Sequence, residues 1–337
     1  MDANKGVMMK VYKATGSGTI TIETMEPPQD KSLVKVKISQ IMLTHQDLNF
    51  FKGAVKTDYP HALGSIATGI VSDDRNEYGL KRGTKVIIDP YECEINDRLD
   101  LPSRVKTCGL ERDGLLSDFV YLPIEKITPF PEDVQEEEAI FTVKIATAME
   151  TINSFRVSKG DYMVIIGGNS LCNILAQLAM YFQLIPIVVD NNEKYLKKME
   201  ANGIYYTINS TKEVPYEKVM ELTGGRMAEH TVYEATSGAP SSFLFSLAKD
   251  GGDCTVVSEN KFQRKMEADL NLISRKQLRV KGVSSGASEI DSAINILAQK
   301  IINFDDLIDS RYDLEDVKKA FLELEEAQGH TVLINLI

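Results

Sequence analysis

The chain has 337 residues, of which 43% are hydrophobic and 26% are charged, so it is long enough for two globular domains and is neither disordered nor fibrous. Its net charge of −11 at pH 7 repels phosphate backbones and anionic bilayers, which argues against nucleic-acid and membrane partners. The four cysteines are widely spaced and no secretory or membrane-spanning run is present, so we expect a thiol-reduced, cytoplasmic protein.

Short, alternating segments rich in β-branched residues fill the chain up to about residue 131. The clearest of them cover residues 19–22, 33–38, 85–88 and 117–122. Clusters of Gly, Pro and Asp separate these segments, as they do between strands. Because the apolar residues recur with a period of two, the pattern predicts a mostly antiparallel sheet or barrel.

Beyond about Ser158 the hydrophobicity pattern changes to short apolar strands that alternate with amphipathic segments. The six predicted strands are Tyr162–Ile166, Ile185–Val189, Tyr205–Ile208, His230–Glu234, Asp253–Val257 and Gln277–Val283. Buried strands separated by helical segments indicate a doubly wound parallel sheet. Helix-like segments follow at residues 289–302 and 312–327, and a terminal strand is predicted at 331–337.

The first of these strands runs directly into a glycine-rich turn and a helix. The turn reads Gly167-Gly168-Asn169-Ser170-Leu171-Cys172. Its position is that of the phosphate-binding turn in a dinucleotide-binding βαβ unit, although only the first glycine of G-x-G-x-x-G is kept. Asn169 places a side chain where the pyrophosphate normally approaches the backbone, and Cys172 separates helix and strand slightly.

Asp190 ends the second strand, 23 residues after Gly167. A carboxylate at this place accepts hydrogen bonds from the ribose hydroxyls of the adenosine and repels the 2′-phosphate of NADP. The next residues, Asn191 and Asn192, offer no cation to that phosphate, so we predict NAD rather than NADP. In the alternative interpretation Gly167 only turns the chain and Asp190 caps the following helix.

Three segments of the first half resemble the medium-chain dehydrogenase/reductase superfamily. Residues 44–53 resemble its C-x-x-D-x-H-x-x-x-G segment, residues 59–69 resemble its P-x-x-x-G-H-E-x-x-G segment, and residues 109–114 match the G-x-x-x-D-G of the zinc-type branch. The resemblance implies an α/β protein with a GroES-like β-barrel catalytic domain and a Rossmann doubly wound parallel-sheet domain. It also implies a small-molecule substrate and a homodimer or homotetramer paired through the edge strand at 277–283. The implied domains are 1–144 with 284–337, and 145–283.

The same resemblance identifies Thr44, Ser65 and Val143 as the positions of the zinc ligands. Two of these side chains are hydroxyls too weakly acidic to ionise and the third has no lone pair, so we expect no catalytic zinc. The structural zinc lobe is reduced to Cys93 and Cys108. We interpret these two thiols as ordinary small residues, with a two-cysteine metal site as the alternative.

The resemblance also implies roles for residues around the lost metal. His45 would reach the cofactor pyrophosphate, and Thr147 would reach the nicotinamide. Gln46 and Asn49 stand where the family has the Ser/Thr and His of its proton relay for alcohols, so that relay is lost. Substrates that delocalise the charge left by hydride attack need the least electrophilic help. We therefore predict a zinc-independent, NAD(P)(H)-dependent oxidoreductase that reduces a conjugated or otherwise activated carbonyl or alkene.

The substrate oxygen in that enzyme would accept a hydrogen bond from Thr44, Ser65 or Lys144. Each assignment has a structural alternative: Lys144 as a solvent-facing helix lysine, and Asp47 as a local cap. A different class of function also fits the losses, namely a non-redox lyase or cyclase, a partner subunit or a ligand-binding pseudoenzyme. Saturable binding of a nicotinamide dinucleotide distinguishes the two classes.

Overall fold

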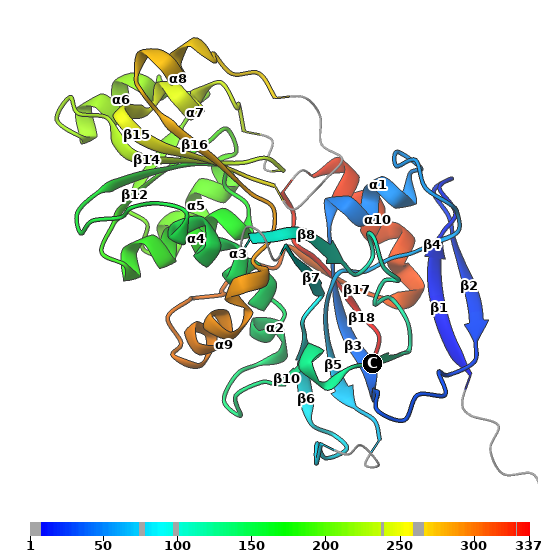
Figure 1. Cartoon of the computed structure of the whole chain (residues 1–337). Helices are drawn as coiled ribbons and strands as arrows, with labels where there is room; N and C mark the ends of the chain where they lie inside the picture. The colour runs from blue at the N-terminus through cyan, green and yellow to red at the C-terminus, as the bar shows by residue number, and fades with distance from the viewer. Residues whose placement is uncertain (1–7, 74–77, 97–100, 237–238, 259–265, 328) are drawn as a thin grey trace, which may run out of the picture. The chain divides into compact units, whose positions relative to one another are not determined.

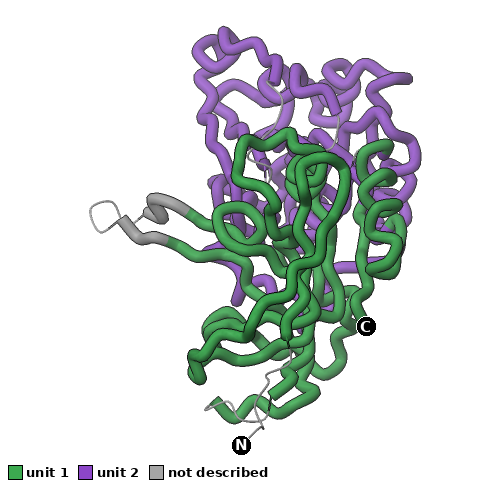
Figure 2. The backbone as a smooth tube through the Cα atoms, turned by 90° about the vertical axis from the view of Figure 1, so that its right-hand side faces the viewer, with its two compact units in different colours: residues 1–143, 309–326, 331–337 green, residues 144–308, 327–330 purple. Residues whose placement is uncertain are grey.

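A computed structural model describes residues 8–73, 78–96, 101–236, 239–258, 266–327 and 329–337. The chain forms two compact units (Figure 2). Unit 1 comprises residues 1–143, 309–326 and 331–337, and unit 2 comprises residues 144–308 and 327–330. The chain passes from unit 1 to unit 2 within helix α3 (Thr142–Asn153).

Residues 284–308 lie in unit 2, whereas the predicted boundary at residue 283 placed them with the first domain. The reason is their packing against helices of unit 2. Gly286 approaches α3 so closely that a Cβ atom on it would lie 2.2 Å from the carbonyl carbon of Ala146. Gln177 exchanges hydrogen bonds of 2.9 and 2.8 Å with the backbone of Asn303. This segment also holds η2 (Ala287–Glu289) and α9 (Ile290–Ala298).

Unit 1 is built mainly from antiparallel strands, as predicted. The strands are β1 (Met9–Ala14), β2 (Ile20–Met25), β3 (Val34–Leu43), β4 (His61–Ala62), β5 (Ile66–Val71), β6 (Lys85–Ile88), β7 (Tyr91–Asn96), β8 (Leu101–Thr107), β9 (Phe119–Leu122), β10 (Ile127–Pro129), β17 (Ser310–Asp313) and β18 (Val332–Asn335). Within the described residues they form sheets of order β2-β1-β4 and β10-β6-β5-β3-β18-β17, with β9 also on β3, and a separate β7-β8 hairpin.

The helical elements of unit 1 are α1 (His45–Phe51), η1 (Ile124–Lys126), α2 (Glu136–Ala139), η3 (Leu314–Asp316) and α10 (Val317–Glu326). Residues 312 and 313 were predicted to be helical, but they belong to β17, which pairs in parallel with β18. The core of the unit lies between the main sheet and these helices. There Phe51 of α1 stacks on Phe321 of α10, with ring centroids 4.3 Å apart.

Unit 2 contains the predicted doubly wound parallel sheet. Its strands are β11 (Tyr162–Ile166), β12 (Ile185–Asp190), β13 (Tyr206–Asn209), β14 (Ala228–Glu234), β15 (Ala248–Val257) and β16 (Arg279–Val283). They are parallel and run in the order β13-β12-β11-β14-β15-β16. The six predicted strands are therefore confirmed, and the strand order reverses between β11 and β14, where open α/β sheets bind their ligands.

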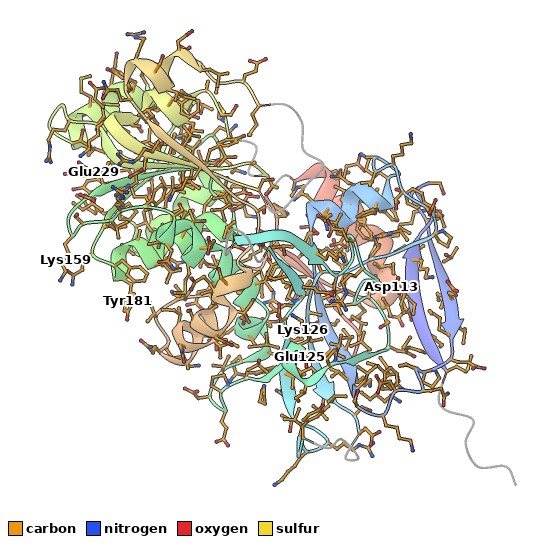
Figure 3. All side chains as sticks on the ribbon, in the orientation of Figure 1. Asp113, Glu125, Lys126, Lys159, Tyr181 and Glu229 are labelled. Carbon is orange, nitrogen blue, oxygen red and sulfur yellow. The ribbon has the colours of Figure 1, made fainter. Side chains whose placement is uncertain are left out.

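Helices cover both faces of this sheet (Figure 1). They are α4 (Ser170–Tyr181), α5 (Glu193–Ala201), α6 (Pro215–Leu222), α7 (Phe243–Ser246) and α8 (Asn271–Arg275). Figure 1 shows α4 and α5 on one face and α6, α7 and α8 on the other. Ten consecutive residues of α4 are buried, from Ser170 to Ala179, while Tyr181 at its last position is exposed (Figure 3). The buried end of α4 is the end at the glycine-rich turn.

Candidate functional site at the switch point of the parallel sheet

Three neighbouring strands of unit 2 end in polar or glycine residues at the same edge of the sheet. β11 is followed by Gly167, Gly168 and Asn169, β12 ends at Asp190, and β14 ends at Glu234. Because the strands are parallel and adjacent, their carboxyl ends meet where the strand order reverses. The structure therefore brings the predicted turn and the predicted carboxylate together.

Asn169 is the N-cap of α4, which explains how an asparagine can replace a glycine here. Its backbone is extended, with φ −69°, so the position needs no left-handed conformation. The side-chain oxygen accepts a hydrogen bond of 3.1 Å from the backbone N–H of Cys172. The side-chain amide donates a hydrogen bond of 2.6 Å to Glu234. Asn169 thus joins the carboxyl ends of β11 and β14 across the switch point.

Glu234 was not singled out in the sequence, although it ends one of the predicted strands. Its side chain is buried, and it accepts hydrogen bonds from the backbone N–H of Thr236 at 3.1 Å and from the Thr236 hydroxyl at 2.8 Å. The signal that could have identified Glu234 was its position as a carboxylate at the end of a buried strand, next to the predicted turn. Its link to Asn169 depends on the strand order, which single-sequence patterns do not give.

Asp190 is completely buried beside the turn. Its Oδ1 atom accepts a hydrogen bond of 2.6 Å from the backbone N–H of Asn192. In the described part of the chain, its Oδ2 atom has no hydrogen-bond partner. Asn192, not Asp190, caps α5, because the Asn192 side chain accepts from the N–H of Lys194. The alternative in which Asp190 itself is the helix cap is therefore wrong.

The orphaned oxygen of Asp190 fits the adenosine ribose of a dinucleotide. A ribose hydroxyl is the donor that Oδ2 lacks, and a buried acceptor without a donor carries a free-energy cost. Gly168 packs directly against this oxygen, since a Cβ atom on Gly168 would lie 3.1 Å from Oδ2. The residues present at this edge therefore suit a nicotinamide dinucleotide.

Burial raises the pKa of Asp190 to about 6, although the backbone N–H groups of Asn192, Asn191 and Gly168 stabilise the carboxylate. Because the folded-state pKa lies above the unfolded value of 3.8, folded chains hold this proton more tightly than unfolded chains. The stability of the protein therefore falls as the pH rises from about 4 to about 6, and the loss is complete above that range. At pH 8 it amounts to about 3 kcal/mol.

Replacing Asp190 with asparagine should remove this pH-dependent penalty. When the pH is lowered from 8 to 5, the free energy of unfolding of the wild type should rise by about 1.4 kcal/mol relative to that of Asp190→Asn. Urea unfolding at both pH values measures it. The new amide has no acceptor at the Oδ2 position, so the change with pH is more informative than the absolute difference. A difference independent of pH would show that Asp190 has an ordinary pKa.

Cys172 and Lys144 share the electrostatic surroundings of the turn. The thiol of Cys172 is fully buried, and burial raises its pKa well above its usual range. Glu234 and Asp190 raise this pKa further, whereas Lys144 lowers it. Cys172 is therefore a neutral packing residue. Lys144 is partly buried near the start of α3.

The remaining predicted cofactor residues divide between the units. Ser170 and Leu171 are buried in the first turn of α4, and Thr147 is fully buried in α3. His45 is partly buried at the first position of α1 in unit 1. The structure therefore groups the turn, Asp190, Thr147 and Lys144 in unit 2, and places His45, Thr44 and Ser65 in unit 1.

Thr44 and Ser65, two of the positions that the resemblance assigns to zinc ligands, are connected through Asp47 in unit 1. Thr44 is the N-cap of α1, and its hydroxyl donates a hydrogen bond of 2.7 Å to Oδ2 of Asp47 and accepts one from the Asp47 N–H. The Oδ1 atom of Asp47 accepts a hydrogen bond of 2.8 Å from Gly64, the neighbour of the buried Ser65. Burial raises the pKa of Asp47, against the effect of these hydrogen bonds. The role of Asp47 as a local cap is confirmed.

Backbone contacts hold the turn at Leu63 and Gly64 against the segment at 109–116. The N–H groups of Leu116 and Leu115 donate hydrogen bonds of 2.8 and 2.9 Å to the carbonyl oxygens of Leu63 and Gly64. Gly114 packs so closely that a Cβ atom on it would lie 1.9 Å from the Leu63 oxygen. The glycines of the recognised motifs therefore serve backbone packing, and we call this arrangement the glycine clasp.

Cys93 and Cys108 differ in environment: Cys93 is exposed on the β7-β8 hairpin and Cys108 is buried. Asp113 is exposed (Figure 3), and Arg112 forms a partly solvated ion pair of 3.3 Å with Glu92. Among the described residues no group of three or more His, Cys, Asp or Glu side chains is arranged to hold a metal ion. No helix in the described ranges is both long and apolar enough to span a bilayer.

Comparison with known proteins gives matches along nearly the whole chain. The family model for an alcohol dehydrogenase GroES-like domain matches residues 30–132, and the model for a zinc-binding dehydrogenase matches residues 171–299. An uncharacterized zinc-type alcohol dehydrogenase-like protein of Haemophilus influenzae is 25% identical, over 95% of this chain and 96% of its own length. A sorbitol dehydrogenase of Halalkalibacterium halodurans is also 25% identical, over 98% and 99%. The crystal structure of a putative zinc-binding dehydrogenase of Sinorhizobium meliloti, bound to NADP, superposes with a TM-score of 0.84 at 20% identity, covering 98% of this chain and 100% of that one.

Proposed function

Because the chain belongs to the medium-chain dehydrogenase/reductase superfamily, we propose that it is an oxidoreductase that uses a nicotinamide dinucleotide and needs no catalytic zinc. The observation that carries the proposal is the buried Asp190, whose Oδ2 atom lacks a donor beside the glycine-rich turn. A ribose would supply that donor. The dinucleotide supplies the hydride, and the chain supplies its position and the electrostatic surroundings of the reaction.

The residues of unit 2 that would hold the dinucleotide are Gly167, Gly168, Asn169, Ser170, Leu171 and Asp190 at the switch point, with Thr147. The family resemblance adds His45 to this set. The carboxylate of Asp190 favours NAD, because it would repel the 2′-phosphate of NADP. The S. meliloti structure contains NADP, so the choice of nucleotide is a property to be measured for this chain.

The residues at the metal positions do not suit zinc. Thr44 uses its hydroxyl to cap α1, Ser65 offers only a neutral hydroxyl, and Val143 has no donor atom. A reaction without a metal is easiest for substrates that spread the developing negative charge, such as enones, enals or quinones. Lys144 is the residue we propose for polarising the substrate oxygen, because its charge acts on Cys172 of the turn and lowers the pKa of that thiol.

We further propose a cytoplasmic protein that assembles as a homodimer or homotetramer. The support for the assembly is β16, which lies at the edge of the parallel sheet. Its first four residues are exposed, so its outer backbone groups are available for pairing with a second copy.

Stabilisation by nucleotide tests the function. At 100 times its dissociation constant, NADH should raise the free energy of unfolding by about 2.7 kcal/mol, and the same concentration of NADPH should raise it less. Thermal unfolding with each nucleotide measures this, with Asp190→Ala as the matched variant expected to lose the preference for NADH. Reduction of an enone or quinone by NADH then tests hydride transfer. Tightly bound zinc whose removal abolishes turnover would contradict the metal-free proposal.

The competing function is a member of the superfamily that no longer transfers hydride. One observation favours it: all six residues of the turn, Gly167 to Cys172, are buried. A folded chain that gains no stability from either nucleotide would support this alternative and contradict the oxidoreductase.

A further inference from the structure

Asp190 lies in surroundings that disfavour a charge on its carboxyl group. The residue has no exposed surface, so an ionised carboxyl loses its hydration. Its Oδ1 atom regains one hydrogen bond, of 2.6 Å, from the backbone N–H of Asn192. Its Oδ2 atom regains none from the described residues. A carboxyl group that is buried and only half satisfied is stabilised by taking up a proton.

The charged neighbours of the turn act in the same direction. The carboxyl groups of Asp190 and Glu234 both raise the pKa of the Cys172 thiol in α4, whereas Lys144 in α3 lowers it. Glu234 is itself buried, at the end of β14. A proton on Asp190 therefore reduces an excess of negative charge around the turn.

Neutral residues pack beside the carboxyl from the turn, from α5 and from β13. A Cβ atom on Gly168 would lie 3.1 Å from Oδ2 of Asp190 and 2.6 Å from Cβ of Tyr195, so Gly168 packs against both. On β13 the register partner of Asp190 is Asn209, which carries an uncharged amide. In the part of the chain that the structure describes, none of these three neighbours donates a hydrogen bond to Oδ2.

Binding of a ribose would reverse this preference. Burial raises the pKa of Asp190 to about 6, against the effect of neighbouring backbone N–H groups. About three quarters of the nucleotide-free molecules therefore carry a proton on Asp190 at pH 5.5. A ribose hydroxyl donates a hydrogen bond to the ionised carboxylate, and such a bond favours the charged form. Nucleotide binding and protonation of Asp190 therefore oppose each other.

We propose that NAD⁺ binds only to the carboxylate form of Asp190 and displaces the proton that the free protein holds there, so that pH controls the occupancy of the nucleotide site. This inference rests on the proposed function and adds a regulated property to the same site. The proton passes to the solvent, and no covalent bond of the nucleotide changes. By linkage, the apparent affinity for NAD⁺ should fall as the pH drops below about 6, and Asp190 should have no effect on it at higher pH.

The test is isothermal titration calorimetry with NAD⁺ at pH 5.5 and pH 8. NAD⁺ is the probe because NADH decomposes in acid. Titrations in two buffers with different enthalpies of ionisation give the number of protons released for each nucleotide bound. We expect about 0.8 proton at pH 5.5 and less than about 0.1 proton at pH 8, with about fourfold weaker binding at pH 5.5.

Two variants assign the proton to a residue. Asp190→Asn keeps the shape of the side chain and cannot titrate, so it should release less than about 0.2 proton at pH 5.5. Its affinity for NAD⁺ should differ by less than about twofold between the two pH values. Glu193→Gln is the matched control, because Glu193 is an exposed carboxylate in the first turn of α5. It should release as many protons as the wild type.

The other outcomes separate this inference from the proposed function. Equal affinity at both pH values without proton release would overturn the inference and leave the oxidoreductase proposal standing. Release of the same proton by Asp190→Asn would overturn it too, since another group would then titrate. Absence of binding to the folded wild type at pH 8 would overturn the inference and the proposed function together.

A weakly binding Asp190→Asn protein does not prevent a decision. In that case Glu193→Gln and Glu234→Gln are compared with the wild type at pH 5.5. Undiminished proton release from both variants supports Asp190 as the source, and loss of the release in either contradicts it. Urea unfolding at both pH values establishes that each titrated protein is folded.

Discussion

Replacing Gly114 with alanine is expected to destabilise unit 1 by about 4 kcal/mol. The new methyl carbon would lie 1.9 Å from the Leu63 carbonyl oxygen and 2.8 Å from that of Ala62, both of which are backbone atoms. The chain can relieve this overlap only by separating the two segments of the glycine clasp. That movement weakens the hydrogen bonds that Leu63 and Gly64 accept from the 115–116 backbone. Urea unfolding at neutral pH measures the loss.

Gly282→Ala is the matched control for this substitution. Its Cβ atom would meet nothing within 4 Å, and its φ does not lie in the left-handed region, so the unfolding free energy should change by less than about 0.5 kcal/mol. A similarly small effect of Gly114→Ala would mean that the clasp opens at little cost.

Replacing Asp47 with alanine is expected to cost about 3 kcal/mol. The substitution removes the acceptor of the Thr44 N–H, the Thr44 hydroxyl and the Gly64 N–H, at distances of 2.9, 2.7 and 2.8 Å. Relief from burying the carboxylate, which raises the pKa of Asp47, offsets part of this cost. Chemical denaturation with a probe in unit 1 measures the difference.

Thr44→Ser is the control for the Asp47 experiment. A serine hydroxyl keeps both hydrogen bonds of the cap, so the stability should change by less than about 1 kcal/mol. If Asp47→Ala were as mild as Thr44→Ser, the carboxylate would have another role. Its hydrogen bond to Gly64, the neighbour of Ser65, would then need a catalytic explanation.

The architecture could be predicted from the sequence because buried residues recur with a regular spacing in strands and helices. The strands of the parallel sheet are buried on both faces and are visible as short apolar runs. β17 was missed because its four residues, Ser310 to Asp313, are polar and depend on β18 for pairing. The boundary at 283 differs from the observed one because the contacts of Gly286 and Asn303 with helices of unit 2 leave no pattern in the sequence.

The candidate site was partly predictable for a similar reason. The turn and Asp190 lie at the carboxyl ends of predicted strands. The predicted parallel sheet therefore places them close together. Glu234 joins the site through its tertiary contact with Asn169, which no local pattern shows. For Thr44 the signal was present: a threonine followed three residues later by an aspartate is the pattern of a capping box. This pattern favoured a structural role for Thr44 over the predicted hydrogen bond from Thr44 to the substrate.

The glycine clasp gives the segment beside Ser65 a shape that main-chain contacts alone maintain. Its two segments are joined by main-chain groups, so the rigidity next to position 65 does not depend on coordination by the side chain there. The side chain at position 65 can therefore be exchanged without loss of the hydrogen bonds that Leu63 and Gly64 accept from the 115–116 backbone.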